Sequence, residues 1–156
     1  MIWILLIVFQ LKHFIADYLL QGKYMLGKFK STGWALPLTS HCTVHFIFTT
    51  TIALMFVSLG KALLLGLLDF ILHFIMDRIK ASPNLLGKYQ VLSKSEMKRL
   101  LAFENKDGDI DGLRPTKYGV ESSIKSNVLF WWSLGLDQMV HHLTDILTIY
   151  LILEVL

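Results

Sequence analysis

Residues Asp69–Lys80 read DFILHFIMDRIK, an apolar run with ionisable side chains at four-residue intervals. These side chains are Asp69, His73 and Asp77, and four-residue spacing places them on one face of a helix. An ionisable residue is costly to bury in a membrane-spanning helix, so a line of them indicates a shared metal ion, a proton path or a polar ligand. The architecture therefore depends on which residues this helix face meets.

The composition indicates an all-α polytopic membrane protein. Of the 156 residues, 54% are hydrophobic and 17% are charged, against about 45–50% and about 25% in soluble domains. A bilayer requires about 20 apolar residues for each helical span, so the chain has room for about four spans and one modest extramembrane segment. We expect a bundle of about four transmembrane helices that forms a single domain over residues 1–156.

The apolar segments predict where these spans lie. The expected spans are about 2–20, 41–59, 62–79 and 128–156, with an insertion at about 80–125. Thr39 or Ser40 is the expected N-cap of the second span. A short connection around Gly60 predicts that the second and third spans form an antiparallel hairpin. After Gly135 the chain is predicted to be either one long helix or a short interfacial helix joined to a span.

The polar insertion contains two recognisable local patterns. Ser93 and Glu96 have the spacing of a capping box, and the apolar residues that follow predict an amphipathic helix on the cytoplasmic-side membrane surface. Residues 105–112 read NKDGDIDG and resemble half of a calcium loop. Because Tyr118 stands where that loop needs a bidentate Glu, an Asp/Gly-rich turn is the preferred interpretation. The role of residues 84–123 is left open.

Basic residues predict the orientation in the membrane. The loop after the first span and the segment after the third lie on the same side of a four-span protein, and they hold most Lys and Arg residues, whereas the opposite side offers only Lys61. The positive-inside rule then places both loops in the cytoplasm and both termini outside. Counting 1.5 Å per residue along each helix, polar residues of all four spans reach one layer near the cytoplasmic side.

All six histidines fall in apolar segments and none falls in the polar insertion. A single histidine on an apolar face is usually a hydrogen-bonded core residue, but six of them at matched depth with several aspartates favour a metal site, because isolated buried carboxylates are unstable. The expected metal ligands are His13, Asp17, His41, His45, His73, Asp77 and His141. Zinc suits these ligands best, with iron or manganese as alternatives. A structural network of hydrogen bonds and ion pairs between helices is the competing interpretation.

Several neighbouring polar residues have predicted roles around this metal site. Asp137 is a candidate ligand or general base, and Gln21 and Gln138 are candidates to orient ligands or substrate. Arg78 and Lys80 are candidates to bind an anionic head group, although ordinary snorkelling anchors are the competing interpretation. Asp69 lies one turn deeper than His73 and is a candidate hydrogen-bond partner of that imidazole.

The ordered motifs HxxxDxxxQ at residues 13–21, HxxxH at 41–45, HxxxDxxK at 73–80 and DQxxH at 137–141 resemble one family. It comprises uncharacterised small membrane proteins of bacteria and phages, the domain-of-unknown-function family numbered thirty-three-oh-seven. The resemblance implies four spans in a bacterial cytoplasmic (inner) membrane and makes phage origin plausible, but it implies no activity. It does not cover the insertion at residues 84–123.

The leading hypothesis is a membrane-embedded, metal-dependent hydrolase that acts at the cytoplasmic leaflet on an amphipathic substrate such as a phosphoester. A bound divalent metal brings the pKa of its water to about 7 and polarises the scissile oxygen. The alternatives are a proton- or ion-coupled small transporter, and a non-enzymatic phage membrane protein that binds a host partner. The expected partners are membrane lipids and a phosphate-containing substrate, with no nucleic acid, and a homo-oligomer is left open.

Overall fold

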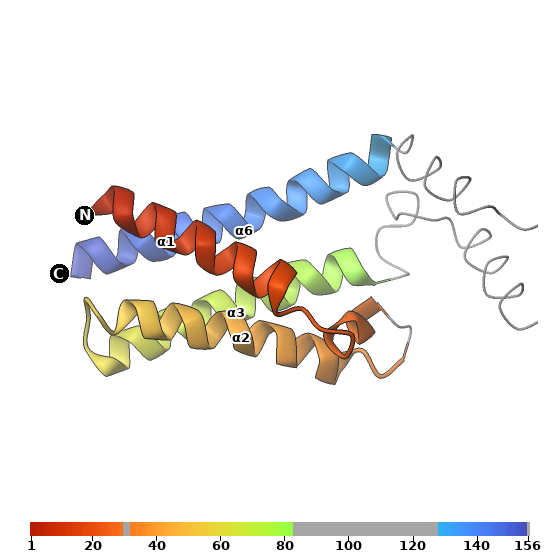
Figure 1. The fold of residues 1–156 in the computed structure, drawn as a ribbon, viewed down its shortest axis with the longest axis horizontal. Helices are drawn as coiled ribbons and strands as arrows, with labels where there is room; N and C mark the ends of the chain where they lie inside the picture. The colour runs from red at the N-terminus through yellow and green to blue at the C-terminus, as the bar shows by residue number, and fades with distance from the viewer. Residues whose placement is uncertain (30–31, 83–127, 156) are drawn as a thin grey trace, which may run out of the picture.

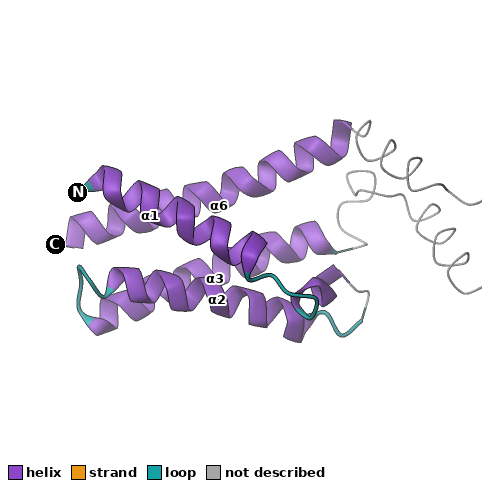
Figure 2. Ribbon diagram, in the orientation of Figure 1, coloured by secondary structure: helices purple, strands orange, loops and turns teal. Residues whose placement is uncertain are grey.

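A computed structural model describes residues 1–29, 32–82 and 128–155. Over these residues the chain is helical and contains no strand (Figure 2). The four long helices are α1 (Ile2–Phe14), α2 (Ala35–Ala53), α3 (Leu59–Ala81) and α6 (Val128–Val155). A π-helical turn, η1 (Ile15–Leu19), continues α1, and a 3-10 helix, η2 (Met25–Phe29), precedes α2. The all-α expectation is confirmed for the described residues.

The four long helices run alternately up and down and close into a bundle. α1 contacts α2 and α6, and α3 contacts α2 and α6. The N-terminus, the C-terminal end of α6 and the connection between α2 and α3 lie at one end of the bundle (Figure 1). The ends of η1, α3 and the start of α6 lie at the other. The predicted α2–α3 hairpin is therefore confirmed.

A glycine sets the close approach of α2 and α3. Gly66 of α3 is buried, and a Cβ atom at this position would lie 3.0 Å from the carbonyl oxygen of Phe46 and would also meet the Thr50 side chain. Because a backbone atom cannot rotate away as a side chain can, only glycine fits here without separating the two helices.

Two predicted helix limits are corrected. α2 begins at Ala35, before the predicted caps Thr39 and Ser40, which both lie inside the helix. Pro37 does not prevent this earlier start. Backbone N–H groups in the first turn of a helix have no acceptor within the helix, so the N–H that proline lacks would be unpaired in any case. α2 also ends at Ala53 and not at residue 59. Gly135 interrupts nothing, because α6 is one continuous helix over Val128–Val155.

The interior has an apolar half and a polar half. At the end of the bundle with the termini, seven buried hydrophobic side chains form one cluster, the apolar cluster: Leu5, Phe9, Ala53, Ala62, Leu65, Ile149 and Ile152. Towards the opposite end, lysines, aspartates and histidines are buried beside a few apolar side chains such as Leu38 and Cys42. Each helix therefore changes from an apolar to a polar interior face along its length.

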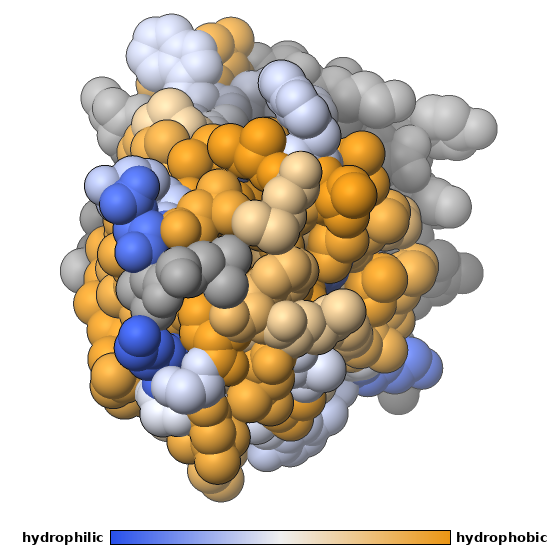
Figure 3. All heavy atoms as spheres, turned by 90° about the vertical axis from the view of Figure 1, so that its left-hand side faces the viewer, coloured by the Kyte–Doolittle hydropathy of each residue, from blue (hydrophilic) through white to orange (hydrophobic). Residues whose placement is uncertain are grey.

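The outer surface is largely hydrophobic. Exposed large hydrophobic side chains occur on all four long helices, and the end of the bundle that carries the termini is mostly hydrophobic (Figure 3). Among the described residues, two stretches are long and apolar enough to cross a membrane, Ile2–Leu19 and Leu59–Ala81. In α2 and α6, histidine and threonine side chains, with aspartates in α6, lower the hydropathy.

The structures predicted for the insertion lie outside the described residues. These are the amphipathic helix after Ser93 and the Asp/Gly-rich turn of residues 105–112. The last residue of the fourth predicted span, Leu156, also lies outside them.

Candidate metal centre

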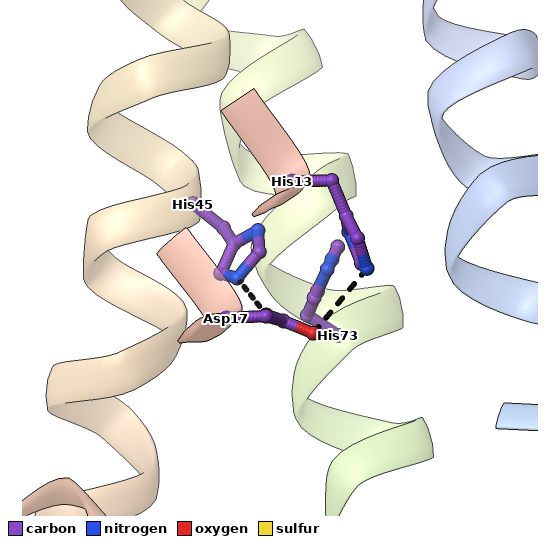
Figure 4. Close-up of side chains that lie close together, drawn as sticks. All are labelled: His13, Asp17, His45 and His73. Atoms are coloured by element: carbon purple, nitrogen blue, oxygen red, sulfur yellow. Dashed lines mark hydrogen bonds and ion pairs between the residues drawn. The ribbon is translucent and has the colours of Figure 1, made fainter. Parts of the chain in front are cut away.

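Three helical segments bring four predicted ligands together. We call His13, Asp17, His45 and His73 the His-rich set. One potential ligand atom from each of these residues lies within 4.8 Å of those of the others. The Asp17 carboxylate joins two imidazoles, with Oδ1 at 2.8 Å from His45 Nε2 and Oδ2 at 3.3 Å from His13 Nε2. Figure 4 shows all four side chains pointing toward one another from α1 with η1, from α2 and from α3.

The π-helical turn lies at the end of this set. Asp17 belongs to η1, directly after the last turn of α1 that carries His13. π-helical turns are rare and occur frequently at functional sites. Here the turn places the Asp17 carboxylate next to His13 of the preceding turn of α1 and next to His45 of α2.

A second group lies beside the first. We call Asp77, Asp137 and His141 the Asp-rich set, and their potential ligand atoms also lie within 4.8 Å of one another. His141 Nε2 is 3.4 Å from Asp137 Oδ1 and 3.7 Å from Asp77 Oδ1. The His73 ring stacks between the rings of His45 and His141, with centroid distances of 3.8 and 4.1 Å. The two sets are therefore in direct contact.

His41 bridges the two sets. Its Nε2 lies 3.2 Å from Asp77 Oδ2 and 3.4 Å from Asp17 Oδ1. Its ring also lies edge-on to that of His45, at a centroid distance of 5.0 Å. The structure therefore places this predicted ligand between the sets.

A hydrogen-bonded layer beneath the His-rich set orients His73. Asp69 Oδ1 lies 2.8 Å from His73 Nδ1, and Asp69 Oδ2 accepts hydrogen bonds from Lys12 Nζ at 2.8 Å and from Thr49 Oγ1 at 2.5 Å. Lys12 Nζ also donates to Asp145 Oδ1 at 2.7 Å. We call Lys12, Thr49, Asp69 and Asp145 the lysine layer. His73 Nδ1 also lies 3.2 Å from the Asp69 backbone carbonyl, its hydrogen-bond acceptor. Acceptors on Nδ1 leave Nε2 as the nitrogen that faces a metal, which is the usual arrangement around ligating histidines.

The buried imidazoles retain unused nitrogens. Within the described part of the chain, His73 Nε2 and both ring nitrogens of His141 have no hydrogen-bond partner, and neither has Asp137 Oδ1. Buried polar atoms are nearly always hydrogen-bonded, so each exception requires an explanation such as an ion. Nitrogen and carboxylate donors that converge in this way fit zinc, iron or manganese.

In the described part of the chain, the buried site contains more aspartates than lysines to pair with them. Five aspartates lie there, namely Asp17, Asp69, Asp77, Asp137 and Asp145, and three lysines bind them directly, namely Lys12, Lys28 and Lys80. With neutral imidazoles, this leaves two negative charges. Buried charge is strongly unfavourable without a partner, so protonated imidazoles, a protonated carboxylate or one divalent cation must supply the balance.

The remaining predicted site residues have different surroundings. Gln138 accepts a hydrogen bond from His13 at 3.3 Å and donates one to Asp137 at 3.1 Å, so it links the two sets. Gln21 is half-buried after η1 and belongs to neither set. Arg78 places its guanidinium over the Trp34 ring, 3.6 Å from the centroid. Lys80 donates to Asp137 at 2.5 Å and is therefore part of the site.

Sequence reasoning missed Lys12, Lys28 and Thr49 as parts of the site, and it placed Asp145 in the polar layer without giving it a role. Lys12 directly precedes His13 in an apolar span, which is itself a signal of function. Asp145 continues the four-residue spacing of Asp137 and His141. Lys28 and Thr49 carried no comparable signal, because a loop lysine and a threonine within a span are both common.

A family model matches residues 5–156, which is nearly the whole chain. The chain belongs to the DUF3307 family. The description of this family is "Protein of unknown function (DUF3307)", and the match confirms the family suggested by the resemblance. The matched range also includes residues 84–123, which the resemblance did not cover. No curated protein and no solved structure matches the chain.

Proposed function

We propose that this chain is a membrane-embedded, metal-dependent hydrolase with its site near the cytoplasmic leaflet. The observation that carries the proposal is the pair of contacting donor sets, which leave imidazole nitrogens unpaired. Among the described residues, the Asp17 carboxylate of the His-rich set has no lysine partner, and the lysine layer beside that set has one carboxylate more than it has lysines. The proposed ligands are the four residues of the His-rich set and the three of the Asp-rich set, with His41 between them. An amphipathic phosphoester is the proposed substrate.

The number of donors supports catalysis more than a structural metal. Four donors complete a tetrahedral site, whereas three leave a position open for water or substrate, as catalytic zinc sites do. The Asp-rich set has three. A divalent cation held by these residues would supply a Lewis acid and an activated water. Asp137 then acts as a ligand, and Gln138 holds its carboxylate.

The distribution of polar side chains supports the proposed four-span arrangement. In α2 and α6, the side chains that lower hydropathy include His41, His45, Asp137 and His141, and all four are buried inside the bundle. Their outward side chains are largely apolar, as are those of α1 and α3. All four helices therefore present an apolar outer face, which is what lipid requires.

The orientation can be tested with single cysteines. We propose that both termini face away from the cytoplasm of a bacterial inner membrane, so Lys61 lies outside and Lys23 inside. In a Cys42→Ala background, a membrane-impermeant maleimide should label Lys61→Cys in intact cells and Lys23→Cys only after lysis. Labelling in the reverse order would contradict this orientation.

The apolar cluster argues against the transporter alternative. A carrier needs a polar path that reaches both membrane faces. The buried charged residues end at the lysine layer, and beyond it the interior is filled by Leu5, Phe9, Ile149 and their neighbours, with the buried Thr148 hydroxyl bonded to a carbonyl of its own helix. A site that opens to one side suits an enzyme at one leaflet.

Elemental analysis and a substrate screen test the proposal together. The full chain, purified in detergent, should contain bound zinc, iron or manganese, and it should hydrolyse a member of a panel of phosphoesters with short acyl chains. His73→Ala should lose both metal and hydrolysis, whereas Lys61→Ala, an exposed change at the other end, should lose neither. A wild-type protein without metal, or a His73→Ala variant with full metal content, would refute the metal site.

A further inference from the structure

The two donor sets differ in charge. The four donors of the His-rich set carry one negative charge, that of Asp17. The Asp-rich set carries two, and each is already matched by an ammonium group: Lys28 Nζ donates to Asp77 Oδ2 at 2.6 Å, and Lys80 Nζ donates to Asp137 Oδ2 at 2.5 Å. The Asp-rich set with its two lysines is therefore neutral before any metal binds.

The lysines leave one oxygen of each carboxylate available. Both ammonium groups bind Oδ2 atoms, whereas the Oδ1 atoms of Asp77 and Asp137 face His141 Nε2. A cation bound between those three atoms therefore does not need to displace either lysine. It does need to enter a neutral site that two ammonium groups already adjoin, where its full charge would be unbalanced in a buried environment.

A phosphate group resolves that imbalance. It brings negative charge and several acceptor oxygens, it fits the open coordination positions of a three-donor site, and lysine ammonium groups are effective phosphate donors. Lys28 is 3% exposed and is held by Asp77 inside the bundle, so it is a built part of the site and not a surface anchor. The Lys80 side chain is 26% exposed, which leaves this side of the set accessible.

We propose that the Asp-rich set binds its cation together with a phosphate group of the substrate, and that Lys28 and Lys80 are the residues that couple the two. The His-rich set binds its cation without an anion. The inference rests on the proposed metal site, and it adds that the second cation arrives with substrate. Coupling between two ligands is reciprocal, so phosphate should strengthen cation binding by the same factor by which the cation strengthens phosphate binding.

Manganese titration of the zinc-loaded full chain in detergent tests this coupling. The protein is first given one equivalent of zinc for the His-rich set, and free Mn²⁺ is then followed by electron paramagnetic resonance, since carboxylate-rich sites suit manganese. Three arms are compared: no anion, inorganic phosphate, and a short-chain phosphatidate. Phosphate or phosphatidate should raise Mn²⁺ affinity at least about fivefold, the low end of typical ligand coupling. The anion with the larger effect identifies the source of the phosphate group.

Lysine variants locate the coupling. Lys28→Gln and Lys80→Gln should each bind Mn²⁺ more tightly without an anion and should show a smaller phosphate effect, whereas Lys61→Gln should behave as wild type. Equal Mn²⁺ affinity with and without either anion in the wild type would overturn the inference, and that arm depends on no variant. An undiminished phosphate effect in folded Lys28→Gln and Lys80→Gln would also overturn it. A failure to bind zinc at all would instead refute the proposed function.

Discussion

Asp69 Oδ1 lies 2.8 Å from His73 Nδ1, one helical turn away on α3. The same carboxylate holds Lys12 and Thr49 through its other oxygen, so three helices fix its position. The imidazole is consequently fixed with the rings of His45 and His141 stacked against it, and its Nε2 has no hydrogen-bond partner within residues 1–29, 32–82 and 128–155. These two residues of α3 thus have different roles: Asp69 orients the His73 imidazole, and His73 belongs to the His-rich set.

Asp69→Asn should weaken metal binding without removing a proposed ligand. An amide lacks the charge with which the carboxylate attracts the His73 imidazole, although the Asp69 backbone carbonyl, 3.2 Å from Nδ1, remains. Loss of such a carboxylate partner typically costs about 10–100-fold in metal affinity. Competition with a chelator of known affinity measures the change. Thr49→Val, which removes a single donor to Asp69, should have a smaller effect, and Thr51→Val, an exposed change on the same helix, should have none. Unchanged affinity in Asp69→Asn would contradict the orienting role.

Adjacent histidines on α6 offer a matched pair. His141 is buried in the Asp-rich set, whereas His142 is half-buried, belongs to neither set and contacts the His13 ring at a centroid distance of 5.1 Å. In the presence of phosphate, His141→Gln should lower the affinity for the second cation by more than about tenfold, because ligand loss exceeds the effect of losing a hydrogen-bond partner of a ligand. His142→Gln should retain the wild-type affinity for the second cation. Equal losses in both variants would indicate a general disturbance of α6 and would contradict the assignment.

The period-four motif of α3 allowed much of the site to be predicted from the sequence. A helix repeats its face about every four residues, so His73 and Asp77 could be placed together, and their pairing with His45 followed from the α2–α3 hairpin. Lys28 could not be placed, because its position depends on how η2 packs on α2. There, Gly27 meets the Pro37 ring so closely that a Cβ atom would lie 2.9 Å from it. Such loop packing leaves no periodic signal.

The start of α2 was mispredicted for a related reason. Thr39 and Ser40 are good N-cap residues, but inside the helix Ser40 and Thr43 satisfy their hydroxyls by donating to carbonyls four residues earlier. Local capping preference therefore lost to the packing of Pro37 and Leu38, which are both buried. The free energy gained from a local capping preference is smaller than the free energy gained by burying side chains in the folded protein.

Gly66→Ala should destabilise the α2–α3 hairpin. The added methyl would meet the Phe46 carbonyl oxygen at 3.0 Å as well as the Thr50 side chain, so the helices must separate. Overpacking of this kind typically costs about 1–3 kcal/mol. Unfolding in mixed micelles with increasing denaturing detergent measures it. Gly60→Ala is the control, since a Cβ atom there has no neighbour within 4 Å. If both variants unfold at the same detergent fraction, the close approach does not limit stability.

Lys12→Met should be the most destabilising single change in the lysine layer. Lys12 is 2% exposed and its ammonium joins Asp69 to Asp145. Methionine preserves the length of the side chain but leaves two buried carboxylates without their cation, and removing one partner of a buried ion pair typically costs about 3–5 kcal/mol. Lys61→Met, at an exposed position, should change stability by no more than about 0.5 kcal/mol.

A triple variant separates charge from packing in this layer. Lys12→Met with Asp69→Asn and Asp145→Asn removes the ammonium and both carboxylates together, so it leaves no uncompensated charge. Replacing a complete buried ion cluster by neutral groups is often close to neutral for stability, so the triple variant should regain most of the loss. Metal affinity should nevertheless stay low, because Asp69 no longer orients His73. A triple variant as unstable as Lys12→Met would show that the lysine stem acts through packing, whereas restored stability with full metal affinity would remove the lysine layer from the site.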